Sequence, residues 1–116
     1  MTQKTRPELS ALYERLARTE DGARSEAARK RHEKGFRTAR ENLHDLVDDG
    51  SFLEYGQLAV AAQRSRRSYE DLQLETAADG LITGIGSVNA SLVGEEAAQT
   101  VVIIGDFSVL AGTQGF

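Results

Sequence analysis

The chain of 116 residues contains no cysteine, no tryptophan and a single proline, and only 6% of its residues are aromatic. Without cysteine it can form no disulfide and no thiolate metal site, which fits a reducing compartment. No segment approaches the roughly 18 consecutive apolar residues of a membrane span, and the polar decapeptide MTQKTRPELS at the amino terminus lacks the apolar core of a secretion signal. We therefore expect a soluble, cytoplasmic protein without a membrane partner.

An excess of basic charge is also missing, because 14 Lys and Arg residues face 18 Asp and Glu residues and the formal net charge is −4. Nucleic acids and anionic membranes favour proteins with surplus Lys and Arg, so neither is expected as the principal partner. The only histidines, His32 and His44, are too far apart for a zinc motif of the HExxH type. We expect no metal site.

The apolar residues are distributed unevenly along the chain. Residues 1–50 are dense in charge, whereas the β-branched apolar residues lie mostly after Leu81. A single core that draws evenly on the whole chain is therefore not expected. The pattern predicts a leading helical segment at 1–50, a connecting segment at 51–79, and a first β-hairpin with its exit loop at 80–116.

Two amphipathic helices are predicted in the first half. Pro7 and Glu8 suit a first helical turn, and the apolar spacing that follows predicts a helix over about residues 8–18. The polar stretch up to Gly35 predicts a solvated helix or a mobile arm. Thr38 and Glu41 then form a TxxE capping box, which starts a second helix. Its apolar stripe and its expected left-handed end are Ala39, Leu43, Leu46, Val47 and Gly50.

The second half predicts β-structure. The stretch SFLEYGQLAV is interpreted as a short strand or turn, and AAQRSRRSYEDLQLETAAD as a connection without sustained periodicity. GLITGIGSVN and VVIIGDF are interpreted as the two strands of a hairpin, with NASLVGEEAAQT as the hairpin loop or a ragged continuation. The continuous apolar run from Val101 to Ile104 predicts a strand that is buried on both faces.

Glycines and acids near these strands favour structural roles. Gly84 and Gly86 lack the third glycine of a dinucleotide motif and lead to a strand, so we interpret them as relief of crowding in the hairpin. Asp48 and Asp49, next to a glycine, are typical of a solvated turn rather than an acid–base pair. Asp106 is predicted to fasten the exit loop by accepting backbone hydrogen bonds.

The best candidate site is the closing stretch GDFSVLAGTQGF, where small residues at the carboxyl end of a strand would let a ligand approach backbone N–H groups. A basic run precedes the capping box, and a second basic cluster lies further on. Such runs are usually solvated faces balanced by nearby acids, and the functional alternative is contact with a phosphate. The two groups are Arg29, Lys30, Arg31, His32, Lys34, Arg37 and Arg40, and Arg64, Arg66 and Arg67.

Three blocks in order, TARENLHDLVDDGSFLEYG, ADGLITGIGSVNA and VVIIGDFSVLAGTQG, resemble the amino-terminal part of the carboxyltransferase (beta) subunits of biotin-dependent acyl-CoA carboxylases. That family includes acetyl-, propionyl- and methylcrotonyl-CoA carboxylases. Its pattern reads approximately TARERI, DPGSFxE, DGVVTGxGxVNG and DFTVxGGT. This chain departs from the pattern at Asp49, Ala90 and Ala111, which bears on the subfamily more than on the family.

The resemblance implies an α/β chain that forms the amino-terminal portion of a crotonase-like (ClpP/crotonase) ββα fold, preceded by amphipathic helices. It implies transfer of a carboxyl group from carboxybiotin to the α-carbon of an acyl-CoA, with the enolate held by backbone N–H groups. Biotin would be carried on a separate domain or subunit. The implied partners are acyl-CoA, biotin carboxylase and biotin carboxyl carrier subunits, and further copies of the full subunit in a homo-oligomer.

The resemblance also implies which residues lie near the acyl-CoA, and it implies no catalytic side chain. Phe107, Ala111, Gly112 and Thr113 are expected to line the acyl-CoA cleft, and Arg37 or Arg40 to approach a CoA phosphate. The family's glycine-rich oxyanion motifs are expected beyond Phe116. Two hypotheses stay open: a piece of a carboxyltransferase subunit with no turnover of its own, and a short non-catalytic protein of the same fold that binds carboxylase subunits.

Overall fold

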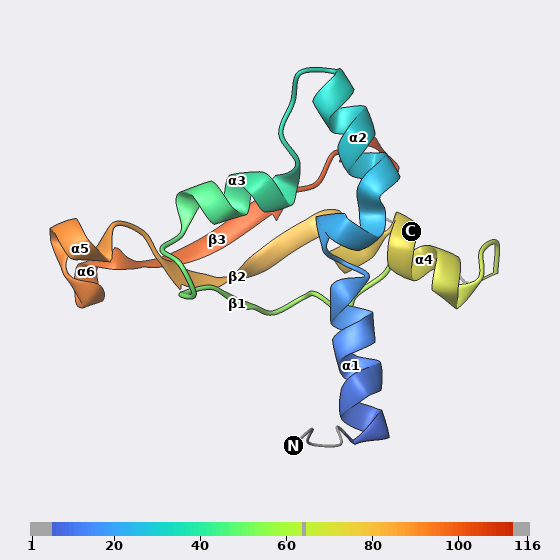
Figure 1. Ribbon diagram of the computed structural model, residues 1–116, viewed down its shortest axis with the longest axis horizontal. Coiled ribbons are helices and arrows are strands. Elements are labelled where there is room, and N and C mark those ends of the chain that lie inside the picture. Colours follow the sequence, from blue (N-terminus) through green and yellow to red (C-terminus); the bar gives the residue numbers. More distant parts are fainter. Residues whose placement is uncertain (1–5, 64, 113–116) are drawn as a thin grey trace, which may run out of the picture.

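The computed structural model (Figure 1) describes residues 6–63 and 65–112. These residues form six α-helices, three 3₁₀ helices and a three-stranded sheet. The first helices are α1 (Pro7–Ala17), α2 (Ser25–Glu33) and α3 (Ala39–Leu46). The strands are β1 (Leu53–Glu54), β2 (Leu81–Ser87) and β3 (Gln99–Gly105). The remaining α-helices are α4 (Tyr69–Glu75), α5 (Ala90–Val93) and α6 (Glu95–Ala98), and 3₁₀ helices cover Asp21–Arg24, Ala77–Gly80 and Leu110–Gly112.

The capping signals of the sequence place the first helices correctly. The Thr38 hydroxyl accepts a hydrogen bond from the Glu41 N–H at 3.1 Å, and the Glu41 carboxylate accepts one from the Thr38 N–H at 2.9 Å, so the predicted capping box is confirmed. The predicted role of Gly50 as the helix end is wrong, because α3 already ends at Leu46. Gly50 is left-handed as expected, with φ +71°, but it lies in the turn that follows.

The sheet has the strand order β1-β2-β3 (Figure 1) and is antiparallel throughout. Ile82 of β2 lies opposite Ile104 of β3. Gly84 lies opposite Glu54 of β1 and Val102 of β3. A Cβ atom at Gly84 would lie 2.1 Å from the carbonyl oxygen of Leu53, which no real side chain tolerates. The prediction that this glycine relieves crowding between strands is confirmed.

A small core lies between α3 and one face of the sheet. Its buried members are Ala39 and Leu43 from α3 with Ile82 and Val102 from the strands, and Val47, Phe52 and Ile104 pack around them. The other face is open, since Val101 and Ile103 of β3 expose 73% and 69% of their surface. The prediction that β3 is buried on both faces is therefore wrong, because the described residues cover only one face of the sheet.

Two segments without clear periodicity are helical. The connecting segment contains α4, whose start is capped by the Ser68 hydroxyl accepting from the Asp71 N–H at 3.1 Å, and Leu72 and Thr76 are fully buried. The hairpin loop contains α5 and α6 instead of an irregular turn. These helices have seven residues or four, so they are too short for the apolar repeat that identifies a helix in sequence.

The predicted solvated helix before Gly35 is confirmed as α2, which buries none of its residues. The chain as a whole is extended, with a radius of gyration of 15.8 Å. A compact domain of this length would have about 13 Å. The extended shape and the open sheet face both follow from a core that only α3 covers.

A basic cavity at the exit of strand β3

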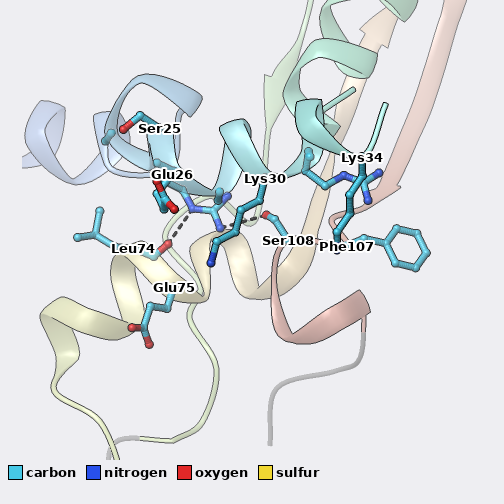
Figure 2. Close-up of a pocket in the computed structure, with 12 residues that line it drawn as sticks. Ser25, Glu26, Lys30, Lys34, Leu74, Glu75, Phe107 and Ser108 are labelled. Atoms are coloured by element: carbon cyan, nitrogen blue, oxygen red, sulfur yellow. Dashed lines mark hydrogen bonds between the residues drawn. The ribbon is translucent and has the colours of Figure 1, made fainter. Parts of the chain in front are cut away.

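A cavity of about 600 Å³ lies between α2 and the segment that leaves β3, with the carboxyl-terminal end of α4 forming another wall (Figure 2). Phe107 lies at one end with its ring directed away from the other labelled side chains, and Lys30 extends from α2 across the opening (Figure 2). The lining residues are Ala23, Arg24, Ser25, Glu26, Ala27, Lys30, Arg31, Lys34, Leu74, Glu75, Phe107 and Ser108.

The helical spacing of α2 places its cations on the face of the helix that lines the cavity. Ala27, Lys30, Arg31 and Lys34 stand at i, i+3, i+4 and i+7, and all of them line the cavity. The helix ends in a Schellman arrangement, in which the Phe36 N–H donates to the Arg31 carbonyl at 3.0 Å and the Gly35 N–H donates to the His32 carbonyl at 2.9 Å. Gly35 adopts φ +81°, which glycine tolerates without strain.

Each acid of the cavity is paired with an arginine that does not line the cavity. Glu26 accepts hydrogen bonds from Arg29 at 2.5 and 3.1 Å, and these bonds hold the pKa of the Glu26 carboxyl below its usual value. Glu75 accepts one from Arg67 at 2.7 Å. Within the described residues Lys30, Arg31 and Lys34 make no ion pair with a carboxylate. The cavity therefore presents three cations that have no ion-pair partner among the described residues.

Asp106 fastens the segment that leaves β3, as predicted. Its carboxylate accepts hydrogen bonds from the Ser108 N–H at 2.9 Å and the Ser108 hydroxyl at 2.6 Å, and its own N–H donates to the Gly80 carbonyl at 2.8 Å. Arg24 ties this turn to the rest of the molecule. Its buried guanidinium donates to the Leu74 carbonyl at 2.7 Å and the Ser108 hydroxyl at 3.1 Å, and lies 3.4 Å from the Asp106 carboxylate.

The structure brings only part of the predicted site to this cavity. Phe107 lines it, and Ala111 and Gly112 follow in the 3₁₀ helix Leu110–Gly112. Leu110 and Ala111 both have positive φ, at 46° and 52°, a conformation that costs energy for residues with a side chain. Thr113 lies outside the described residues.

The two arginines predicted to contact phosphate lie elsewhere. Arg37 is exposed, and its guanidinium donates to Asn42 at 2.8 Å and to Asp45 at 3.3 Å. Arg40 forms a two-pronged pair with Glu54 at 2.5 and 3.0 Å, and both side chains are 7% exposed. Burial lowers the pKa of Arg40, but the hydrogen bonds and charge of Glu54 more than offset this and raise it above its usual value. Neither arginine lines the cavity.

Asp48 fastens a second turn, between α3 and the hairpin. Its carboxylate accepts hydrogen bonds from the Ala90 N–H, the Asn89 N–H and the Ser87 hydroxyl, at 3.0, 3.0 and 2.8 Å. Bonding to the Ala90 N–H, followed by the Ser87 hydroxyl, lowers the pKa of Asp48. The interpretation of Asp48 as part of a turn is therefore confirmed.

Sequence reasoning named Lys30, Arg31 and Lys34 only as members of the longer basic run, and it did not name Arg24 at all. The spacing of Lys30, Arg31 and Lys34 along α2 was a usable signal for a shared face. Nothing in the sequence indicated that Arg24 would be buried, because its partners Leu74, Asp106 and Ser108 are distant in the chain.

Within residues 6–63 and 65–112, no three potential metal-ligating side chains gather into a group. None of the helices in that part of the chain combines the length and apolar character needed to cross a membrane.

Comparison with known proteins matches residues 30–115 to the carboxyl transferase domain family. The beta4 subunit of a biotin-dependent long chain acyl-coenzyme A carboxylase from Mycobacterium tuberculosis (strain ATCC 25618 / H37Rv) is 34% identical over 111 residues, which cover 96% of this chain and 18% of that protein. Methylmalonyl-CoA decarboxylase subunit alpha from Veillonella parvula is 31% identical over 107 residues, 92% of this chain and 19% of that protein.

Solved structures of related enzymes are also similar to this chain. A single-chain, multi-domain long-chain acyl-CoA carboxylase superposes with a TM-score of 0.92 and 58% identity, covering 99% of this chain and 12% of that chain. The transcarboxylase 12S core, solved as a hexamer with methylmalonyl-CoA and methylmalonic acid bound, gives a TM-score of 0.68 and 26% identity over 97% of this chain and 20% of that one. The chain thus spans about a fifth or less of the proteins that it matches.

Proposed function

This chain belongs to the carboxyl transferase domain family, and we propose that it forms the amino-terminal part of an acyl-CoA carboxyltransferase in which the basic cavity binds the CoA portion of the substrate. The observation that carries the proposal is the set of three cations, Lys30, Arg31 and Lys34, that face the exit of β3 without acidic partners in the described residues. CoA is the one part of an acyl-CoA that carries several phosphate charges.

Charge and geometry both support a phosphate ligand. An arginine offers a planar fork of donors to phosphate oxygens, and each lysine adds a mobile point charge. Lys30 of α2 and Lys34, the residue that caps the carboxyl-terminal end of α2, are four residues apart, which is about 6 Å along the helix axis, so both can contact a single diphosphate. Glu26 and Glu75 are hydrogen-bonded to Arg29 and Arg67, which weakens the opposing effect of their negative charges on this field.

The segment after β3 supports contact with the remainder of the substrate. We propose that Phe107, Ala111, Gly112 and Thr113 lie along the acyl-CoA cleft and act largely through backbone groups. The positive φ values of Leu110 and Ala111 support this, since strained backbone is often found at functional sites. Asp106, Ser108 and Arg24 hold the start of this segment against the cavity.

Of the two arginines predicted from the sequence, Arg37 is the better phosphate contact. Its guanidinium is half exposed and its partners, Asn42 and Asp45, are surface groups. Arg40 would first have to leave the buried carboxylate of Glu54.

We propose that biotin reaches the active site on a separate carrier domain or subunit. Six of the residues that line the cavity are ionisable, and such a lining suits phosphates better than the uncharged ring of biotin. We therefore assign no step of the reaction through biotin to this segment. Biotin carboxylase and carboxyl carrier components, and further copies of the subunit, are the expected partners.

The open face of the sheet supports a place within a larger domain. Val101 and Ile103 of β3 and Leu53 of β1 form an exposed apolar patch that water would disfavour. We propose that this face packs against other parts of the same carboxyltransferase, and that the segment has no turnover of its own.

The test uses the full-length protein, with a long-chain acyl-CoA and propionyl-CoA as alternative acceptors of a carboxyl group from carboxybiotin. Replacing both lysines, K30Q/K34Q, is expected to raise KM for the acyl-CoA about tenfold or more, because two charge-assisted contacts to phosphate are lost. The matched control is R66Q, which removes an exposed cation outside the cavity lining.

Two results would contradict the proposal. One is a wild-type protein that neither binds acyl-CoA nor carboxylates it, which would favour a non-catalytic binding protein. The other is an unchanged KM in K30Q/K34Q, which would place the phosphates elsewhere. Backbone amide signals of Ala111 and Gly112 that stay unmoved during acyl-CoA titration would separately contradict the role of the segment after β3.

A further inference from the structure

Two exposed aromatic rings lie near the guanidinium of Arg31, which lines the cavity together with one of them, Phe107. Phe36 follows α2 and exposes 55% of its surface, while Phe107 follows β3 and exposes 66%. The guanidinium carbon of Arg31 lies 4.7 Å from the centroid of the Phe36 ring and 6.0 Å from that of the Phe107 ring. A single exposed phenylalanine is unremarkable on a protein surface, but two that share a cation beside a cavity form a distinct arrangement.

Backbone hydrogen bonds fix the residues that carry both rings. Phe36 is held by its N–H bond to the Arg31 carbonyl, so its ring is attached to the helix that carries the cation. Phe107 stands inside the turn closed by the bond from the Val109 N–H to the Asp106 carbonyl at 3.1 Å. Arg24 anchors that turn through Ser108 and Asp106. Little backbone freedom is left to lose when a flat ligand binds.

We propose that Phe107 and Phe36, with Arg31, form a stacking site for a purine base, which in the substrate proposed above is the adenine of CoA. Every nucleobase offers a flat π-face to an aromatic ring, and a guanidinium plane stacks on bases as well. Lys30 and Lys34 lie on the same helix as Arg31 and line the same cavity. The rim would hold the base while these lysines meet the phosphates.

An acyl chain suits this rim less well. Phe107 and Phe36 are both more than half exposed, so a chain laid on them would remain largely in water. The charged guanidinium of Arg31 also lies against both rings, and it favours a polarisable base over an alkyl chain. The inference rests on the proposed function, and its test separates the two.

The experiment measures, by calorimetry, the binding to the full-length protein of CoA and of 4′-phosphopantetheine, which lacks the adenosine and the two phosphates of the nucleotide half of CoA. The F107L and F36L variants keep apolar bulk and remove the ring. Each is expected to bind CoA about tenfold more weakly and 4′-phosphopantetheine with wild-type affinity, because base stacking on one ring contributes about that much. The control is Y13L, which removes a similarly exposed ring from α1.

Each outcome tests the stacking site separately from the proposed function. Wild-type affinity for CoA in F107L and F36L overturns the stacking site, and if K30Q/K34Q still loses affinity, the proposed function stands. An equal loss for both ligands also overturns the stacking site, because it assigns the rings a structural role. A wild-type protein that binds neither ligand removes the proposed function and, with it, this inference.

Discussion

Replacing Gly84 by alanine should detach β1 from the sheet. The added Cβ would lie 2.1 Å from the carbonyl oxygen of Leu53 and 2.8 Å from Cζ of the Phe52 ring. The ring can turn away, but the carbonyl belongs to the backbone of a paired strand and cannot. Relief requires β1 to move away from β2, which breaks the register of Leu53 with Ile85 and of Glu54 with Gly84.

The size of the effect follows from these contacts. Overpacking a close-packed site costs about 1 to 3 kcal/mol. Loss of the bond from the Tyr55 N–H to the Thr83 carbonyl, 2.8 Å long, adds about 1 kcal/mol. The lower chain entropy of alanine in the unfolded state returns about 0.4 to 1 kcal/mol. The free energy of local opening at β1 should therefore fall by about 2 kcal/mol, which is about a 30-fold loss of amide protection.

Hydrogen exchange of the peptide that covers residues 52–56, measured in the full-length protein, reads this local opening directly. G105A is the matched control, since Gly105 ends β3 and a Cβ there meets nothing within 4 Å. G86A should fall between the two, because its Cβ would lie 3.3 Å from a side-chain methyl of Val47, which can yield. Equal protection of the peptide in G84A and G105A would refute the reasoning.

Two further predictions concern charges. R40M should cost about 3 to 5 kcal/mol of local stability because it leaves the buried Glu54 carboxylate unpaired, and R40M/E54L should cost clearly less, as measured by exchange at β1 in both variants. The hydrogen bonds from His32 and from the Thr38 N–H lower the pKa of the Glu41 carboxyl from 4.5 to about 2. The stabilisation that the Glu41 carboxylate gives to the first turn of α3 is therefore complete above pH 4.5 and is lost as the pH falls toward 2. E41Q keeps a side-chain oxygen for the cap but cannot titrate. After correction for the intrinsic exchange rate, hydrogen exchange at the first turn of α3 in E41Q should show no loss of protection between pH 4.5 and 2. A loss of protection with pH as steep as that of the wild type would contradict this assignment.

The parts of the fold that local chemistry determines could be predicted from the sequence. The capping box at Thr38 and Glu41 depends on groups three residues apart, and Gly84 marked the crowded centre of the sheet. The turn fastened by Asp106 also followed from its neighbours. In each case the interacting groups are close in sequence, or the residue type itself carries the constraint.

What distant contacts determine could not be predicted. Helix α4 has one fully buried leucine and no apolar repeat to reveal it, and its contacts come from residues distant in sequence, such as Arg18 at Gln73 and Arg24 at the Leu74 carbonyl. The apolar run of β3 was interpreted as buried on both faces. An apolar composition shows that a strand can be buried, but it does not show which segments cover it. The exposed Val101 and Ile103 show the difference.

The candidate site falls between these two cases. Along α2 the sequence offers Glu26 a partner either at Arg29 or at Lys30, and Glu33 can pair with Arg29 as well, so spacing alone does not decide which cations stay free. In the structure Arg29 takes both carboxylates. That choice leaves Lys30, Arg31 and Lys34 without an ion-pair partner among the described residues, on the face that meets the exit of β3. The basic character of the cavity therefore depends on Arg29, which does not line the cavity.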